Sequence, residues 1–297
     1  MCLLDLQIIA IAFLVATACV LPGTFLVLRG IALMSDAISH AILPGMVIMF
    51  LITKNVHSPL LMAGAGLAGI LTVLLTESII ASKRLQKDAA IGLVFPLFFS
   101  VGIVLISLYA RSVHLDVDMV IMGELLFAPL NTVSLWGCNL GPAAFWIMGT
   151  ILLMNALFIS FCYKELILTT FNPTYATTIG LGTAATHYGL MCLTSITCVG
   201  AFEIVGAIVV VSLIITPPAT AYLLSKRVDT MLYRAIIIAL LSVCMGYAGA
   251  MQYDVSVAGA IATANGFCFF SALILSVARH YHAKKWHVKR LNKQHAV

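Results

Sequence analysis

Charged residues are scarce in this chain. Asp, Glu, Lys and Arg together make up only 9% of its 297 residues, whereas 62% are apolar. Soluble domains carry about 25% charged and about 45–50% apolar residues. A single soluble domain of this size could not bury all of these apolar side chains away from water. The composition therefore excludes a soluble enzyme, a disordered chain and a nucleic-acid-binding protein. Long uncharged runs such as residues 204–224 instead predict an all-α integral membrane protein, because barrel strands would alternate over segments of about 10 residues.

Several sequence motifs are also missing. No Cys-x-x-Cys pair occurs, and most of the eight cysteines lie in or near apolar runs, which favours small buried hydrophobes over a disulfide framework. The phosphate-binding pattern GxxxxGK[ST] is absent, so ATP-driven work by this protein would require an ATPase on another polypeptide. The zinc-protease pattern HExxH is absent as well, which argues against an intramembrane hydrolase.

Breaks in hydropathy predict a polytopic bundle of about eight or nine transmembrane helices in a single domain, residues 1–297. A short basic tail is expected at about residues 280–297. The predicted spans are residues 6–28, 33–53, 58–81, 89–110, 143–163, 178–200, 203–224, 231–250 and 255–279. Residues 111–142 are expected to form an outer loop, whose apolar part, residues 117–130, is re-entrant or interfacial.

The basic residues predict the orientation of the bundle. With these spans, every Lys and Arg except Lys54 and Arg111 falls on one side of the membrane. Basic residues collect on the cytoplasmic side of membrane proteins. The C-terminus is therefore expected in the cytoplasm, and nine spans place the N-terminus outside. The basic tail fits an association with anionic lipid.

Two ionisable residues interrupt the apolar second span. Asp36 and His40 are four residues apart, which puts both side chains on one face of a helix. Charges inside a membrane are costly and commonly mark a transport pathway. A carboxylate and an imidazole together suit Mn, Fe or Zn, and Pro44 frees the His40 carbonyl oxygen from its helical partner. The residues alone leave a second interpretation open, a structural pair hydrogen-bonded within the bundle, and two ligands do not close a metal site.

Glu203 and His187 are secondary candidates for metal ligands. Glu203 lies at the predicted turn between the sixth and seventh spans, where a solvated carboxylate near the outer face is the alternative interpretation. His187 opens the sixth span near the cytoplasmic side. Glu77 precedes Lys83 and Arg84 by one to two helical turns, which favours a role as their ion-pair partner.

Segments in order along the chain resemble one known family, the ABC-3 permeases. The matching segments are residues 23–30 (GTFLVLRG), residues 34–45 (MSDAISHAILPG), residues 168–176 (LTTFNPTYA) with Gly180, and residues 205–221 (VGAIVVVSLIITPPATA). The resemblance covers almost the whole chain, from residue 23 to about residue 279. Two positions differ, since Asn172 stands where the family usually has Asp, and Pro218 where it has Ala.

The resemblance implies a permease subunit of a bacterial ABC importer for zinc, manganese or iron ions, multi-pass in the cell (inner) membrane. The implied fold is that of the larger-permease importers for vitamin B12 and siderophores. The implied partners are a second permease subunit, identical or different, a cytoplasmic ABC ATPase dimer and an extracytoplasmic metal-binding protein. The chain itself would be no enzyme and would hold no permanent cofactor. The resemblance also favours Asp36 and His40 as ligands of the transported ion.

The same resemblance implies that the segment around residues 170–180 contacts the ATPase. Asn172 followed by Pro173 predicts a short helix, with Asn172 as its N-cap and Pro173 at its first position. A glycine can end such a helix. The expected coupling residues are Asn172, Pro173, Tyr175, Ala176 and Gly180.

Two alternative functions remain open at this point. An ABC permease for a metal chelate would need a wide apolar path in place of the Asp36 and His40 pair. An ion-coupled secondary metal transporter would use Asp36 as a proton or Na⁺ site. Folds of the latter kind often show inverted repeats, and the sequence shows none.

Overall fold

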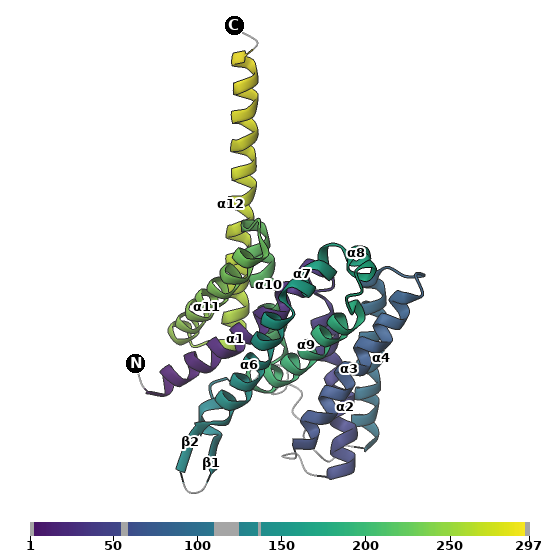
Figure 1. Ribbon diagram of the computed structural model, residues 1–297. Helices are drawn as coiled ribbons and strands as arrows, with labels where there is room; N and C mark the ends of the chain where they lie inside the picture. The colour runs from purple at the N-terminus through teal and green to yellow at the C-terminus, as the bar shows by residue number, and fades with distance from the viewer. Residues whose placement is uncertain (1–2, 55–58, 110–124, 136–137, 295–297) are drawn as a thin grey trace.

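A computed structural model describes the chain at residues 3–54, 59–109, 125–135 and 138–294 (Figure 1). Within those ranges, nine helices are long and apolar enough to cross a membrane, which confirms the predicted fold class. The elements are α1 (Leu3–Arg29), α2 (Met34–Thr53), α3 (Pro59–Ala81), α4 (Lys87–Tyr109), η1 (Ala128–Leu130), β1 (Thr132–Leu135), β2 (Cys138–Pro142), α6 (Ala143–Phe161), α7 (Tyr163–Phe171), α8 (Pro173–Thr178), α9 (Thr183–Val205), α10 (Ala207–Leu224), α11 (Val228–Tyr253) and α12 (Val257–Gln294).

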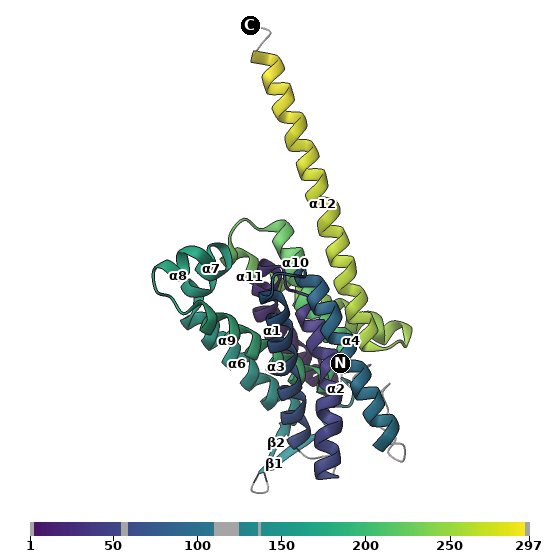
Figure 2. The same ribbon diagram turned by 90° about the vertical axis from the view of Figure 1, so that its right-hand side faces the viewer.

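The helices form two packed groups. In one, α2 packs against both α3 and α4; in the other, α1 packs against α6, α10 and α11, and α12 covers α10 and α11. Helix α9 joins the groups, since it contacts α1, α2, α3 and α6. Both views place α7 and α8 at one end of the bundle, which we call the α8 end, and the antiparallel β1–β2 hairpin at the other (Figures 1 and 2). The last part of α12 extends beyond the bundle at the α8 end.

Buried amides connect helices inside the apolar core. Nδ2 of Asn155 on α6 donates to the carbonyl oxygen of Ala18 on α1 at 3.0 Å and to Oγ1 of Thr197 on α9 at 2.8 Å. Nδ2 of Asn265 on α12 donates to Oγ of Ser212 on α10 at 2.9 Å. In a medium without water each such bond replaces an unsatisfied polar group, so the three helices that Asn155 joins are fixed in register as well as in position.

The close crossing of α1 and α10 depends on Gly23. A Cβ at position 23 would lie 2.2 Å from the carbonyl oxygen of Ile214, far inside van der Waals contact. Only glycine therefore lets the two helices approach this closely, as small residues do at membrane helix interfaces. The crossing places α10 against the helix that leads into Asp36 and His40.

Several boundaries differ from the prediction. The sixth span begins at Thr183 and runs to Val205, whereas residues 178–200 were expected, so the turn to the next span falls at Gly206. Residues 163–178 form two short helices, α7 and α8, and only the second was expected. The β1–β2 hairpin lies within the expected outer loop and was not predicted, although the four residues of β1 (TVSL) alternate between polar and apolar. Most of the apolar part of that loop, up to residue 124, lies outside the described residues.

Candidate metal-ion site

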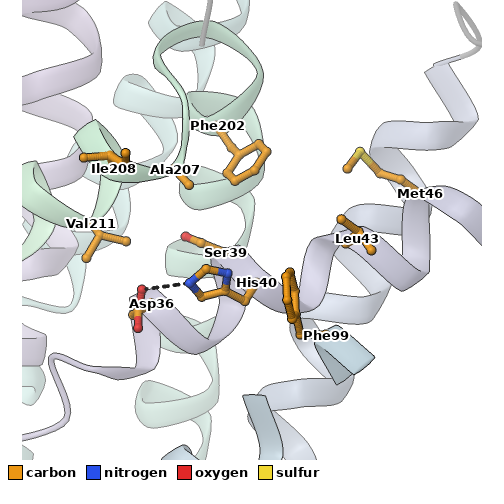
Figure 3. Close-up of a pocket in the computed structure, with 10 residues that line it drawn as sticks. All are labelled: Asp36, Ser39, His40, Leu43, Met46, Phe99, Phe202, Ala207, Ile208 and Val211. Carbon is orange, nitrogen blue, oxygen red and sulfur yellow. Dashed lines mark ion pairs between the residues drawn. The ribbon is translucent and has the colours of Figure 1, made fainter. Parts of the chain in front are cut away.

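Asp36 and His40 face the same side of α2, one helical turn apart (Figure 3). Nε2 of His40 lies 3.4 Å from Oδ1 of Asp36. The Asp36 side chain is 38% exposed and the His40 side chain 37% exposed, although both belong to a helix that can span a membrane. Their polar atoms are therefore available to a ligand and are not consumed by bonds within the core.

Aromatic rings of α4 hold the imidazole of His40 in place. The ring of Phe95 lies 5.1 Å from it between centroids, and the ring of Phe99 packs edge-on at 5.6 Å. The Phe95 ring is tilted by 39° to the imidazole and the Phe99 ring by 79°, and aromatic contacts at these distances favour a defined ring orientation. Because most of their neighbours on α4 are apolar as well, the sequence carried no signal that singled out these two phenylalanines.

The pair opens into a cavity of about 320 Å³. Four helices, α2, α4, α9 and α10, supply its walls, and apart from Asp36, Ser39 and His40 its lining is apolar. The lining residues are Asp36, Ser39, His40, Leu43, Met46, Phe99, Phe202, Ala207, Ile208 and Val211. Phe202, in the last turn of α9, and Ala207, the first residue of α10, lie on either side of the turn between the two helices, beside the pair (Figure 3). Of the lining residues, the sequence predicted only Asp36 and His40.

That turn consists of a single residue, Gly206, which is at once the C-cap of α9 and the N-cap of α10. Its φ of 81° and ψ of 163° lie in a region that is open essentially to glycine alone. The amide of Gly206 donates to the carbonyl oxygen of Phe202, which closes α9 at 3.0 Å. Glycine at this position thus lets two apolar helices meet at the cavity wall with no loop between them.

The arrangement offers one oxygen and one nitrogen ligand, a set that suits Mn²⁺, Fe²⁺ and Zn²⁺. Within the described part of the chain, no group of three or more His, Cys, Asp or Glu side chains is placed to hold a metal ion. The pair alone therefore offers two ligand atoms, which are too few to close a metal site. So few ligands suit brief binding during passage better than permanent retention.

At the α8 end, the predicted short helix is present. Asn172 is its N-cap, with Oδ1 accepting from the amide of Tyr175 at 3.1 Å, and Pro173 occupies the first position. Ala176 is buried, whereas the Tyr175 side chain is 53% exposed. Gly180 follows with a φ of 78°, the left-handed conformation that glycine favours after a helix.

Residues 4–276 match the ABC 3 transport family. The chain belongs to this family. It is a transport subunit, with ATP hydrolysis in a separate subunit, and the expectation drawn from residues 23–45, 168–180 and 205–221 is confirmed.

Relatives within the ABC 3 family are similar over nearly the whole chain. The manganese transport system membrane protein MntD of Bacillus subtilis is 42% identical over 289 residues, which cover 97% of this chain and 98% of that protein. The zinc transport system membrane protein TroD of Treponema pallidum is 42% identical over 276 residues, 92% of this chain and 74% of that protein. Among solved structures, PsaBC from Streptococcus pneumoniae in complex with Fab superposes with a TM-score of 0.73 at 27% identity, covering 90% of each chain.

The two secondary candidates lie outside the cavity of this ABC 3 chain. Glu203 lies in the last turn of α9 with its side chain exposed, and it is absent from the cavity lining although its neighbour Phe202 belongs to it. His187 lies in the second turn of α9, where its Nε2 is 3.0 Å from Oε1 of Glu77. The expected pairing of Glu77 with Lys83 and Arg84 is absent among the described ion pairs, because the carboxylate faces His187.

Proposed function

We propose that this chain is the membrane permease subunit of an ATP-driven importer for divalent transition-metal ions, Mn²⁺, Zn²⁺ or Fe²⁺. The observation that carries the proposal is the exposed Asp36 and His40 pair on a membrane-spanning helix, facing a cavity. Placing a charged group at the bilayer centre costs about 2.5–3.5 kcal/mol even on the lowest scales, so such a pair requires a function or a polar partner. Relatives named as manganese, zinc and probable iron transport system membrane proteins support this substrate class.

In the proposed mechanism, Asp36 and His40 briefly replace part of the hydration shell of the ion. An extracytoplasmic binding protein delivers the ion, and the Asp36 carboxylate and the neutral His40 imidazole supply two ligands. Water and a second permease subunit supply the others. Since the pair is more than a third exposed in the isolated chain, a second subunit placed over it would cover polar surface and bring a second pair to a shared path.

The α8 end is proposed to face the cytoplasm and to seat α8 on an ABC ATPase subunit. The side chains of Phe171, Tyr175 and Ile179 are 62%, 53% and 50% exposed at this end, and form an apolar surface around a short projecting helix. The basic residues Lys83 and Arg84 lie in the turn between α3 and α4, at the same end of the bundle as α8 (Figure 1). Basic residues collect on the cytoplasmic side of membrane proteins, which supports a cytoplasmic location for this end and for the C-terminus that extends from it.

The test is metal uptake by cells that express the complete transporter with Asp36→Ala or His40→Ala. Uptake of Mn²⁺, Zn²⁺ and Fe²⁺ isotopes is expected to be lost, while the ATPase still co-purifies with the permease. Asp88→Ala, which removes an exposed carboxylate from the first turn of α4 outside the cavity, is the matched control and keeps uptake. Near-normal uptake in both pocket variants would refute the assignment.

A further inference from the structure

Arg29, the last residue of α1, connects four helices at the α8 end. Its Nε donates to Oγ1 of Thr170 at 3.1 Å and its Nη2 to Oγ1 of Thr169 at 3.0 Å, both on α7. Its Nη1 lies 2.9 Å from Nδ1 of His187 on α9. The same imidazole reaches Glu77 on α3 through Nε2 at 3.0 Å. We call these five residues the Arg29 cluster.

The chemistry of the Arg29 cluster fixes the state of His187. A guanidinium only donates hydrogen bonds, so Nδ1 of His187 must accept from Arg29. The proton of the neutral ring is then on Nε2, which faces the Glu77 carboxylate. Nδ1 is therefore engaged by Arg29 and Nε2 lies 3.0 Å from a carboxylate oxygen of Glu77, so His187 has a charged neighbour on each side. The planar guanidinium of Arg29 donates directional hydrogen bonds to α7 as well, so the Arg29 cluster holds α1, α7 and α9 in one relative geometry.

The Arg29 cluster adjoins the proposed ATPase contact along the chain. Thr170 precedes the N-cap residue Asn172 by two positions, and α8 begins at Pro173. The amide of Asn172 bonds to the carbonyl oxygen of Leu168 at 2.9 Å, so α7 and α8 are joined without a flexible linker. A displacement of α8 must therefore move the two threonines that Arg29 holds.

Two short routes lead from Arg29 to the Asp36 and His40 pair. The first is the turn at residues 30–33, which is closed by bonds from Ile31 to Leu26 at 3.1 Å and from Ala37 to Leu33 at 3.1 Å, and which enters α2 just before Asp36. The second is Lys87, the first residue of α4, whose Nζ donates to the carbonyl oxygen of Arg29 at 3.3 Å. Helix α4 carries the two phenylalanines that pack against His40.

We propose that Arg29 is a positioning residue that couples the ATPase-contacting segment α7–α8 to the metal-ion pair on α2. The inference rests on the proposed function, and it adds a mechanical element to it. Movement of α8 shifts Thr169 and Thr170, the fork of Arg29 transmits the shift to α1, and the residue 30–33 turn and α4 carry it to Asp36 and His40. Arg29 is partly buried, and its guanidinium contacts hydroxyl and imidazole acceptors but no carboxylate among the described residues. A role in holding α7 and α9 together accounts for this arrangement.

The test uses the complete transporter, with ATPase and metal-loaded binding protein, reconstituted in liposomes. Mn²⁺ and Zn²⁺ uptake and ATP hydrolysis are measured together, so that uptake per ATP reports coupling. Arg29→Ala is expected to lower uptake per ATP by about tenfold, within the usual range of coupling between separate sites. Arg29→Lys, which keeps the charge and loses the fork, is expected to give an intermediate value. Arg84→Ala removes an exposed arginine from the α3–α4 turn and should leave uptake per ATP unchanged.

A second variant guards against simple misfolding. Thr169→Val with Thr170→Val keeps the side-chain shapes and removes both hydroxyl acceptors of Arg29. This double variant should also lower uptake per ATP. Combining it with Arg29→Ala should cause little further loss, because both changes remove the same contacts. A cysteine placed by Tyr175→Cys should still cross-link to the ATPase. Unchanged uptake per ATP in both variants, or losses that match only the amount of folded protein, would overturn the coupling role. If instead the parent transporter shows no ATP-driven uptake, or Tyr175→Cys captures no ATPase, the proposed function itself has failed.

Discussion

Gly45 of α2 and Gly64 of α3 face each other at a helix crossing close to Asp36 and His40. A Cβ at position 45 would lie 2.3 Å from the carbonyl oxygen of Gly64, and a Cβ at position 64 would lie 2.6 Å from that of Gly45. Both positions are buried, so neither backbone has room to yield. The contact fixes the distance between α2 and α3 five residues beyond His40, and it thereby helps to determine where the cavity wall stands.

Gly45→Ala is therefore expected to destabilise the protein by about 1–3 kcal/mol, the usual cost of overpacking a well-packed interior. The added methyl group must push α2 away from α3, which also moves the wall that carries His40. The matched control is Gly66→Ala on α3, because a Cβ at position 66 meets nothing within 4 Å. Thermal unfolding of the purified protein in detergent measures both variants. Equal midpoints for the two would mean that the crossing does not determine the stability of this region.

The sequence predicted the helices well and the cavity only in part. Asp36 and His40 stood out because each is polar within an apolar span, and their spacing placed them on one face. Phe99, Phe202 and Met46 carried no such signal, since they are apolar residues among apolar residues and the walls of the cavity depend on how the helices cross. Composition can indicate that a helix crosses a membrane, but the partner of each apolar face is decided by tertiary packing.

The turn between α9 and α10 shows a related limit. Breaks in hydropathy placed this turn between the predicted spans 178–200 and 203–224, with Glu203 at the turn. The structure places it at Gly206, where the backbone conformation, with φ at 81°, decides the break. Hydropathy does not detect a helix that ends for conformational reasons inside an apolar segment. The short helix α8 was predictable for the opposite reason, since Asn172 and Pro173 are local signals that need no tertiary information.

Asn172→Ala removes the side-chain oxygen that caps α8, and it is expected to cost about 1 kcal/mol in the stability of that helix. The amide of Tyr175 loses its acceptor, so the exposed surface of α8 becomes less ordered and binds the ATPase less well. Asn172→Asp keeps a capping oxygen and should bind at least as tightly as the parent. Co-purification of the ATPase at increasing salt and detergent provides the measurement. Thr174→Ala, an exposed neighbour in the same helix, is the control; a loss of the same size there would show that the cap has no special role.

Tyr163, at the start of α7, gives the protein a pH-dependent contact. Its hydroxyl donates to Oδ1 of Asp229 on α11, and burial together with this carboxylate raises the pKa of Tyr163 to about 12. An unfolded tyrosine titrates near 10. The neutral phenol is thus favoured by folding, so its contribution is complete below about pH 10 and is lost as the pH rises towards about 12.

Tyr163→Phe is therefore expected to lower the unfolding midpoint at pH 8 and to weaken the fall in midpoint between about pH 10 and 12. Unfolding in detergent is followed across that range by intrinsic fluorescence or circular dichroism. Tyr175→Phe, which alters an exposed tyrosine on α8, should keep the slope of the parent protein. A slope that is the same in Tyr163→Phe as in the parent would show that the contact with Asp229 does not contribute to stability.

This chain alone in liposomes should not accumulate Mn²⁺ or Zn²⁺ under an imposed pH gradient, because it carries no nucleotide-binding motif and its cavity holds only one carboxylate and one imidazole. A proton-coupled carrier needs a site whose protonation is linked to ion occupancy, and among the residues that line the cavity only Asp36 and His40 could provide one. Uptake is expected only after the ATPase, ATP and a metal-loaded binding protein are added together. Concentrative, pH-driven entry by the chain alone, abolished by His40→Ala, would instead identify a secondary carrier.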